Sequence, residues 1–421
     1  MAEALRVLYL IGQFPALNHR YLLAEIRQLR KLGIEVDVVS VSPPDRPIHQ
    51  LTPEERDECV RVYFLKSVPI GKAVAMNLAE FLRHPLRYVS GLLYALKLGG
   101  FDARQIFYHL AYFAEAVLIG RLMRQRRISH VHANFSATVS LIVVRTFPVT
   151  MSWVAHGFGE LHDPAATHLA ERVKGALFVR SVSHFGISQM MLSSPQSEWH
   201  KFVYAPLGVD VAVAEANLNR QASLEPRLLC VGRLAPEKGQ SLLLEAVHTL
   251  KAQGKTVLLR LAGDGPDRAS LEKLAADLDI SPSVEFLGWV DPERLRQLYG
   301  DTDICVLSSM AEGIPVVLME AMAMQIACVA PRIMGIPELI RDGIDGLLFT
   351  VSDVIDLVRQ LCALLDSLEL RAQLGRQARV HVARDYDVAQ NTKRFSAILR
   401  EQLQKSTPTE SQSQPRSRKP V

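Results

Sequence analysis

Short apolar runs alternate with longer segments of helical spacing along most of this chain, and that alternation restricts its fold more than any other feature. The front half contains four runs with the length of buried strands, at residues 7–11, 36–41, 130–135 and 150–155. A second series of predicted strands lies at 227–231, 257–262, 284–287, 304–308 and 327–330. Segments of helical spacing lie between the strands, as at 21–32, 241–252, 269–278, 293–300 and 316–324. Such alternation is typical of a parallel sheet covered by helices on both faces.

The two series predict an α/β protein of two doubly wound, Rossmann-like domains that face each other across a cleft. We place the first domain at residues 1–204 and the second at 205–384, and we expect a final helix at 385–403 to pack back on the first domain. Residues 69–127 interrupt the first series with two or three helices rich in Leu, Phe and Tyr, one of them opened by Pro85. Residues 404–421 have the composition of a disordered tail.

Composition and charge exclude several classes of protein. Hydrophobic residues make up 48% of the 421 residues, which argues against disorder over most of the chain. The net charge of +4 is too small to indicate nucleic-acid binding. Residues 1–200 carry 22 basic and 16 acidic residues, so this half is the one we expect to meet an anionic surface.

The cysteines and the apolar segments indicate a cytoplasmic protein. Five cysteines, an odd number without a C-x-x-C spacing, argue against a disulfide framework and a zinc ribbon. The apolar run at residues 7–11 is too short for a signal peptide. We predict no transmembrane helix, because the nearest apolar stretch, residues 128–144, contains two His, one Asn and three Ser.

Ligands of open parallel sheets bind beyond the carboxyl ends of the strands, so the residues just after each strand are the candidates for a site. The run GRLAPEKG at 232–239 follows one predicted strand and places Arg233 and Lys238 in one Gly- and Pro-containing turn. Such a turn can direct both cations at one diphosphate. The alternative interpretation is a solvated basic turn.

A second candidate follows the predicted strand at 304–308. Pro315 suits the first position of a helix, whose free N–H groups favour a phosphate. Glu312 lies just before this helix and Glu320 within it, where both can accept hydrogen bonds from sugar hydroxyls. Alternatively, Glu312 complements the helix dipole and Glu320 is a solvated acid.

Other positions after strands give weaker signals. The run AGDGP at 262–266 resembles the start of a dinucleotide fingerprint, but Arg268 occupies the place of the third glycine. His156 follows the predicted strand at 150–155 and is either a cleft residue or a structural histidine; His132 and Asn134 are less favoured. Two acidic runs are decoys, because Asp301-Thr302-Asp303 lies at the amino end of a strand and Asp385-Tyr386-Asp387 reads as a helix cap.

Taken in order, these segments resemble the family-4 glycosyltransferases, which are retaining enzymes of the GT-B fold. The matching runs, which cover most of residues 205–350, are GVD at 208–210, GRL…EKG at 232–239, AGDGP at 262–266, FLGWV at 286–290, Glu312 to Glu320 with seven residues between, EAMA at 320–323, GIPELI at 335–340 and DG…DGLL at 342–348. The front half resembles the colanic-acid and exopolysaccharide subgroup through Phe14-Pro15, Glu25-Ile26 and the run HVHANF at 130–135. This chain departs from the resemblance at Asn18-His19-Arg20, where Ser-Glu-Thr is usual, and at Gln325, where Gly usually ends the helix.

The resemblance implies roles for individual residues. Arg233 and Lys238 would hold the diphosphate of a nucleotide-sugar donor, helped by the backbone N–H groups of Gly313, Ile314 and Val316, with Gly265 in a turn near the nucleotide. Glu312 would bind the donor sugar, Glu320 the ribose, and His156 would lie near the reacting carbon. The resemblance further implies retention of configuration by same-face attack, with no metal or other cofactor, since cations positioned at the leaving group can replace a divalent ion.

We therefore expect a glycosyltransferase of cell-surface polysaccharide synthesis, acting on a saccharide or lipid-linked saccharide and not on nucleic acid. A GT-B epimerase of nucleotide sugars and a non-catalytic relative that binds nucleotide sugars are the alternatives. The helices at 70–127 combine apolar stripes with basic residues, which is typical of helices that lie on an anionic membrane surface. The alternative is that these stripes pack on the first domain's own sheet. The protein would then be cytoplasmic, or peripheral at the inner face of the cytoplasmic membrane.

Overall fold

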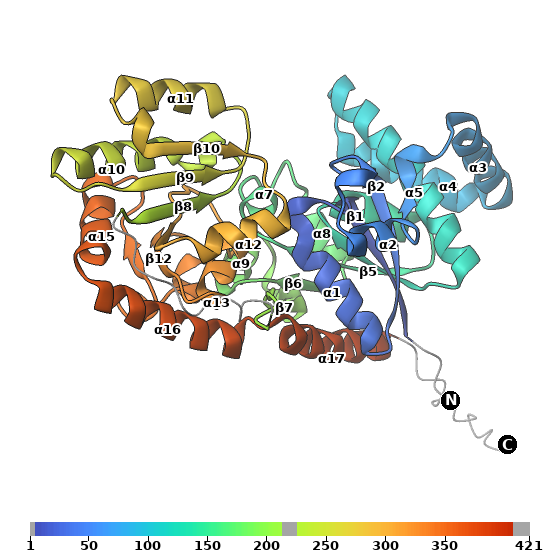
Figure 1. Cartoon of the computed structure of the whole chain (residues 1–421). Coiled ribbons are helices and arrows are strands. Elements are labelled where there is room, and N and C mark those ends of the chain that lie inside the picture. Colours follow the sequence, from blue (N-terminus) through green and yellow to red (C-terminus); the bar gives the residue numbers. More distant parts are fainter. Residues whose placement is uncertain (1–4, 213–224, 407–421) are drawn as a thin grey trace, which may run out of the picture.

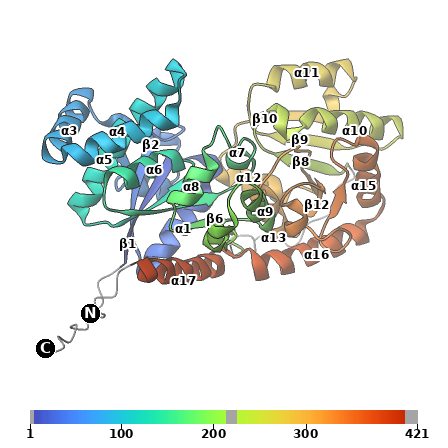
Figure 2. The same cartoon turned by 180° about the vertical axis from the view of Figure 1, so that it is seen from behind.

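The computed structural model describes residues 5–212 and 225–406, which form two α/β domains lying side by side (Figure 1). Seen from behind, each sheet is again sandwiched between helices (Figure 2). The predicted class, two doubly wound domains, is confirmed, because every ladder between the named strands of both sheets is parallel.

The N-terminal sheet has the strand order β3-β2-β1-β4-β5-β6-β7 within the described residues. Its strands are β1 (Arg6–Gln13), β2 (Glu35–Ser42), β3 (Tyr63–Phe64), β4 (His130–Asn134), β5 (Thr150–Ala155), β6 (Phe178–Ser181) and β7 (Phe202–Tyr204). Side chains of β1 alternate between two cores, because successive residues of a strand point to opposite faces. Leu8 and Leu10 pack with the helices of the insert, whereas Tyr9 and Ile11 pack with the first helix of the chain.

Helices cover both faces of this sheet. They are α1 (Arg20–Lys31), α2 (Pro53–Cys59), α3 (Ile70–Arg83), α4 (Pro85–Gly99), α5 (Ala103–Arg126), α6 (Ala137–Thr146), α7 (Phe158–Leu161), α8 (Leu169–Gly175) and α9 (His184–Leu192). The insert consists of α3, α4 and α5, and Pro85 opens α4 as predicted, because its missing N–H costs nothing at a first helical position. Helix α5 is long and apolar enough to cross a membrane by length and composition, so residues 128–144 are not the most apolar segment. Half of its most apolar window is buried, as expected of a core helix.

The C-terminal sheet has the order β10-β9-β8-β11-β12-β13 within the described residues. Its strands are β8 (Arg227–Val231), β9 (Leu258–Ala262), β10 (Val284–Gly288), β11 (Ile304–Val306), β12 (Ala327–Pro331) and β13 (Leu347–Phe349). Its helices are α10 (Gln240–Ala252), α11 (Arg268–Asp277), α12 (Pro292–Gly300), α13 (Val316–Ala323), α14 (Ile336–Leu339), α15 (Val354–Asp366) and α16 (Leu368–Asp385). Gln325, just after α13, has a φ of +57°, a left-handed conformation that glycine adopts more easily.

The final helix, α17 (Val388–Ser406), returns to the N-terminal domain and lies along α1. Its residues Phe395, Leu399 and Leu403 enter the core on the α1 face of the sheet. The apolar spacing continues to Leu403, and the helix extends to Ser406. The prediction of a disordered tail from residue 404 is therefore wrong for residues 404–406. The disorder expected at 407–421 lies outside the described residues.

The chain passes between the domains twice, and the two crossing segments are joined. The backbone N–H of Val209 donates to the carbonyl of Tyr386 at 2.9 Å, and the N–H of Val388 donates to the carbonyl of Val209 at 3.0 Å. The side-chain amide of Asn391 donates to the carbonyls of Leu207 and Asp385, at 2.9 and 2.8 Å. These bonds hold both crossings at one place.

Candidate active site

Three loops meet at the carboxyl edge of the C-terminal sheet, after β8, β9 and β11. Gly239, in the loop after β8, has a φ of +60°, and a Cβ atom there would lie 2.4 Å from the carbonyl oxygen of Ser308. A Cβ atom on Gly265, after β9, would lie 2.2 Å from the carbonyl oxygen of Leu234. Glycine is therefore required at both positions, because the backbones approach too closely for a side chain.

The structure brings Lys238 and Glu312 together. The Lys238 ammonium donates to Glu312 Oε1 at 2.6 Å, and the hydroxyl of Ser309 donates to the same oxygen at 2.7 Å. The two charged side chains are 24% and 12% exposed, so the pair is screened only in part by solvent. Glu312 is thus an ion-pair partner of Lys238, and each side chain fixes the position of the other.

Arg233 shares the loop with Lys238, but its guanidinium pairs with Glu237. Its side chain is 64% exposed. Of the two cations predicted to bind the diphosphate, Lys238 lies at the start of α13. Arg233 is instead paired with a carboxylate of its own loop.

At the start of α13, Pro315 is the N-cap residue, with a ψ of 114°, and Val316 is the first helical residue. The prediction that Pro315 opens the helix is thus wrong by one position, because its backbone is still extended. Gly313 and Ile314 lie in the same approach to the helix.

Glu320 lies one turn further along α13, in a hydrogen bond with α12. The hydroxyl of Tyr299 donates to Glu320 Oε2 at 3.1 Å. Burial raises the pKa of the Glu320 carboxyl. Glu320 and Val316 line a cavity of about 620 Å³ between the domains, together with Arg20 and Tyr21 of α1. The expectation of a solvated helix acid does not hold for Glu320.

His156 lies at the carboxyl edge of the N-terminal sheet, directly after β5. Its Nε2 lies 3.0 Å from the amide oxygen of Asn134, and its Nδ1 lies 3.4 Å from the hydroxyl of Tyr21. Burial lowers the pKa of the His156 imidazole well below its usual value, and the charges of Arg180 and His19 add to this effect. The neutral ring is therefore the favoured form in this structure. His132, in contrast, is fully buried within the sheet, where it contacts Ser152.

An aromatic stack extends from His156. Its ring lies 4.2 Å from that of Phe135, and the ring of Phe135 lies 4.5 Å from that of His19, measured between centroids. Phe135 is 41% exposed and has a φ of +62°, which is strained for a bulky residue. The run Asn18-His19-Arg20, where the chain departs from the resemblance, thus contributes a ring to the stack.

The two domains touch at this point. A Cβ atom on Gly157 would lie 2.6 Å from the Cα atom of Gly313, and one on Gly313 would lie 1.9 Å from the carbonyl oxygen of His156. This backbone contact brings His156 beside the loop that carries Glu312. One cluster therefore contains Lys238, Glu312, Gly313 and His156. Glu320 is connected to this cluster only because it lies on α13, the helix that follows Gly313.

Three features of the interface were missed by sequence reasoning. Glu338, within the matching run GIPELI, accepts hydrogen bonds from the N–H groups of His184 and Phe185 at 2.8 and 2.7 Å, and so caps α9 of the other domain. Glu160 accepts from the N–H of Gly157 at 3.2 Å, and burial raises its pKa to about 7. Phe135 was predicted to be the last residue of a strand, whereas β4 ends at Asn134, so its place just after the strand is known only from the structure.

The decoys have structural roles. Asp303 accepts from the backbone N–H of Arg227 at 2.9 Å, at the amino edge of the sheet, and Asp387 caps α17 by accepting from Gln390. In the described ranges, no group of three or more His, Cys, Asp or Glu side chains is arranged to hold a metal ion.

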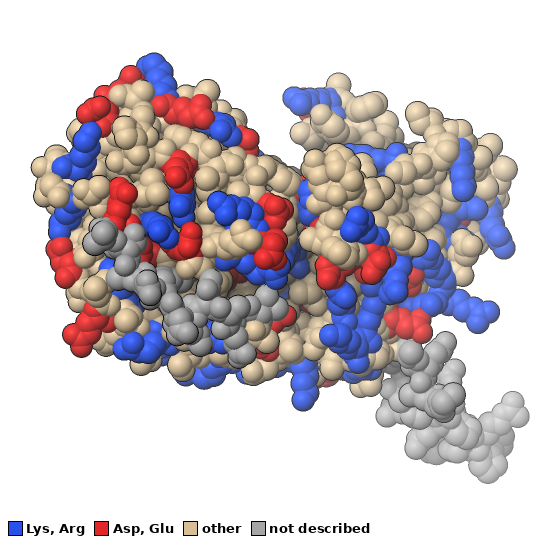
Figure 3. All heavy atoms as spheres, viewed as in Figure 1, with Lys and Arg blue, Asp and Glu red and all other residues tan. Residues whose placement is uncertain are grey.

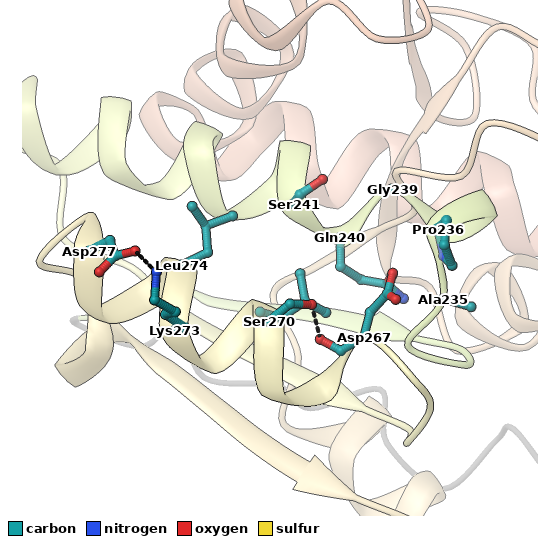
Figure 4. A pocket seen from close by; sticks show the side chains of 11 residues that line it. Ala235, Pro236, Gly239, Gln240, Ser241, Asp267, Ser270, Lys273, Leu274 and Asp277 are labelled. Carbon is teal, nitrogen blue, oxygen red and sulfur yellow. Dashed lines mark hydrogen bonds and ion pairs between the residues drawn. The ribbon is translucent and has the colours of Figure 1, made fainter.

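A second hollow, of about 390 Å³, lies between α10 and α11 (Figure 4). Gln240, Asp267, Ser270 and Lys273 line it, and none of the predicted site residues does. Ala235, Pro236 and Gly239 of the loop after β8 line it, but Arg233 and Lys238 do not, and we do not assign it to the site.

Comparison with known proteins gives the family of the C-terminal domain. Residues 217–381 match the family described as glycosyl transferases group 1. The putative colanic acid biosynthesis glycosyltransferase WcaL of Escherichia coli is 24% identical over 412 residues, 94% of this chain and 99% of that protein. The amylovoran biosynthesis glycosyltransferase AmsK of Erwinia amylovora is 25% identical over 387 residues, 83% of this chain and 88% of that protein.

Solved structures share the fold at lower sequence identity. HepE of Anabaena, in complex with UDP, superposes with a TM-score of 0.71 at 16% identity, over 94% of this chain and 100% of that one. The sucrose-phosphate synthase of Thermosynechococcus elongatus gives 0.72 at 19% identity, over 95% of this chain and 100% of that one. Residues 217–381 therefore match a group 1 glycosyltransferase domain, and the chain as a whole has the GT-B fold of these solved structures.

Proposed function

We propose that this protein transfers a sugar from a nucleotide-diphosphate sugar to a saccharide or lipid-linked saccharide, with retention of configuration, in the synthesis of an exopolysaccharide. The observation that carries the proposal is the Lys238–Glu312 pair just before α13. The backbone of His156, from the other domain, packs against Gly313, the residue that follows Glu312. The relatives named for colanic acid and amylovoran biosynthesis support the polysaccharide as product.

On the donor side, the diphosphate would bind between Lys238, Arg233 and the N–H groups of Gly313, Ile314 and Val316. The diphosphate would compete with Glu312 for the Lys238 ammonium and with Glu237 for Arg233. Glu312, released from Lys238, could then accept from hydroxyls of the donor sugar. Glu320 lines the interdomain cavity and would accept from the ribose.

On the acceptor side, we place the sugar at the edge formed by His156, Asn134 and the exposed part of the Phe135 ring. The side-chain nitrogen of Asn134 is buried and has no hydrogen-bond partner within the described residues, so it can donate to a ligand. In the reaction, the bond between the anomeric carbon and the phosphate oxygen breaks. A bond to the acceptor oxygen forms on the same face, and the acceptor's proton passes to the leaving phosphate. The cations stabilise the charge that grows on that phosphate.

The experiment is a screen of nucleotide sugars, starting with UDP-sugars, with saccharide and lipid-linked acceptors. We expect nucleotide release together with transfer, and an α-linked donor should give an α-linked product by NMR. Conversion of the donor sugar without transfer would establish an epimerase, and binding without turnover would establish a non-catalytic protein. Activity should survive chelation by EDTA; a loss that Mg²⁺ or Mn²⁺ restores would contradict the metal-independent mechanism.

The mechanism has a further test in Glu312. We expect Glu312→Gln to slow turnover without any covalent sugar–enzyme adduct, because a hydrogen-bonding residue forms none. Mass spectrometry of the intact protein during turnover would reveal a glycosylated Glu312 and with it a double displacement.

A further inference from the structure

The helical insert carries a large apolar surface at the outer end of the N-terminal domain. Its exposed apolar side chains recur at one-turn spacing along α3 and α4 and continue at the start of α5. These residues, the insert face, are Ile70, Val74, Leu78, Leu82, Leu86, Val89, Leu93, Phe101 and Phe107. Leu86 is 87% exposed and Ile70 is 83% exposed, so they contribute almost nothing to the core. Contiguous apolar surfaces of this kind mark interaction sites.

Helix α4 packs on its own domain through a different side. Its buried residues are the small ones, Gly91, Ala95 and Gly99. A Cβ atom on Gly91 would lie 2.1 Å from the hydroxyl oxygen of Thr146 on α6, so α4 is already as close to its neighbours as its backbone allows. Tyr88, Leu92, Tyr94 and Leu98 pack partly against the domain's core. Leu86, Val89 and Leu93 stay exposed, so packing on the domain does not account for these three.

The charge around the insert face has one sign. Between residues 66 and 110, the exposed cations are Lys66, Lys72, Arg83, Arg87, Lys97 and Arg104. The same stretch contains two acidic residues. Glu80 is buried and paired with Arg121 and Arg124, and Asp102 caps α5 by accepting from the N–H of Gln105 at 2.8 Å. Figure 3 shows this outer end as largely tan with several blue side chains.

We propose that the insert face lies on the surface of an anionic lipid bilayer. Apolar side chains that project from basic helices can enter the boundary between headgroups and acyl chains, while the cations meet anionic headgroups. A second copy of this chain is a poorer partner, because it would place cations against cations. Both views show α3 and α4 at the end away from the C-terminal domain, so a bilayer there leaves that domain and the cleft accessible (Figures 1 and 2).

The test is co-sedimentation of the full chain with vesicles of phosphatidylglycerol and phosphatidylcholine, or of phosphatidylcholine alone. We expect binding to the anionic vesicles only, weakened by raising salt from about 0.1 M to about 1 M, since the Debye length falls from about 10 Å to about 3 Å. Two variants should each lower binding by about tenfold or more: Leu78→Ser with Leu86→Ser and Leu93→Ser, and Arg83→Glu with Arg87→Glu. The vesicles contain no acceptor, so the result is independent of the proposed transfer reaction.

The matched control replaces exposed apolar residues of the C-terminal domain, Ile355→Ser with Leu368→Ser and Val380→Ser. It should bind vesicles like the wild type. All variants should keep the wild-type unfolding midpoint, because the substituted side chains are exposed. Absence of binding to anionic vesicles at low salt would overturn the proposal, as would equal binding by the insert-face variants. A dimer in sedimentation velocity that the apolar variant abolishes would assign this face to a second copy instead.

Discussion

Arg233 and Lys238 are the residues on which the proposed chemistry depends most. Each is held by a carboxylate of the chain, Glu237 and Glu312 respectively, so both cations are positioned before any donor binds. Donor binding must exchange these carboxylates for the diphosphate, after which the cations are in place for the charge that grows on the leaving phosphate.

We predict that Arg233→Ala with Lys238→Ala lowers kcat by about 10²- to 10³-fold or more, as removal of other electrostatic stabilisers does. Steady-state kinetics with the best donor would measure it. Lys255→Ala is the control, since Lys255 lies in the same domain and pairs with Asp366 away from the cleft. Wild-type turnover of the double variant would show that the site is elsewhere.

Glu160 supplies a prediction about pH. Burial raises its pKa from 4.5 to about 7, so the folded protein binds this proton more tightly than the unfolded chain does. The free energy of unfolding should therefore fall as pH rises from about 4.5 to about 7, by up to about 3 kcal/mol from this group. Glu160→Gln, which cannot ionise, should remove that part of the slope in urea titrations at several pH values. The exposed Glu369→Gln should leave the slope unchanged, and an unaltered slope in Glu160→Gln would refute the assignment.

Among the elements, α9 is notable because its cap comes from the other domain. Ser183 accepts from the N–H of Gly186 at 3.0 Å, whereas the N–H groups of His184 and Phe185 are satisfied by Glu338 of α14. A carboxylate at a helix N-terminus also interacts favourably with the helix dipole. This cap therefore links the stability of one helix to the position of the facing domain.

Glu338→Ala should destabilise the protein by about 1–2 kcal/mol, the usual loss for a charged cap. The more specific outcome is faster hydrogen exchange at the amides of His184 and Phe185, which lose their acceptor. Glu369→Ala, at the start of α16, is the control within one domain. Unchanged exchange at those two amides would mean that the contact across the domains does not persist in solution.

Much of the fold and part of the site could be predicted from the sequence. The alternating pattern is local, so it predicts strands such as β5 and β8, and the carboxyl ends of those strands lead to His156 and Lys238. Glu338, Tyr299 and the exposed ring of Phe135 could not be assigned a partner. Their contacts depend on how distant elements meet, and no local pattern encodes that geometry. The same limit hid the pairing of Lys238 with Glu312, although both residues had been singled out.

At the scale of the whole molecule, the paired crossings make one joint between the domains. Asn391 is 3% exposed and holds the carbonyls of both crossing segments. Asn391→Ala should cost about 1–3 kcal/mol in the free energy of unfolding, because two buried carbonyls lose their donor. Denaturant unfolding would measure it, with the neighbouring exposed residue in Gln390→Ala as control. A loss no larger than that of the control would mean that water replaces the lost donor at the joint.

Helix α17 also sets a condition on how the chain is made. The core around Tyr9 and Ile11 is completed by Phe395 and Leu399, and at about 5 to 20 residues per second their synthesis is separated by about 20 to 80 s. Throughout that interval the α1 side of the nascent N-terminal domain presents an uncovered apolar groove. The N-terminal domain is thus finished only after the C-terminal domain has been synthesised, and it needs protection from aggregation until α17 is available.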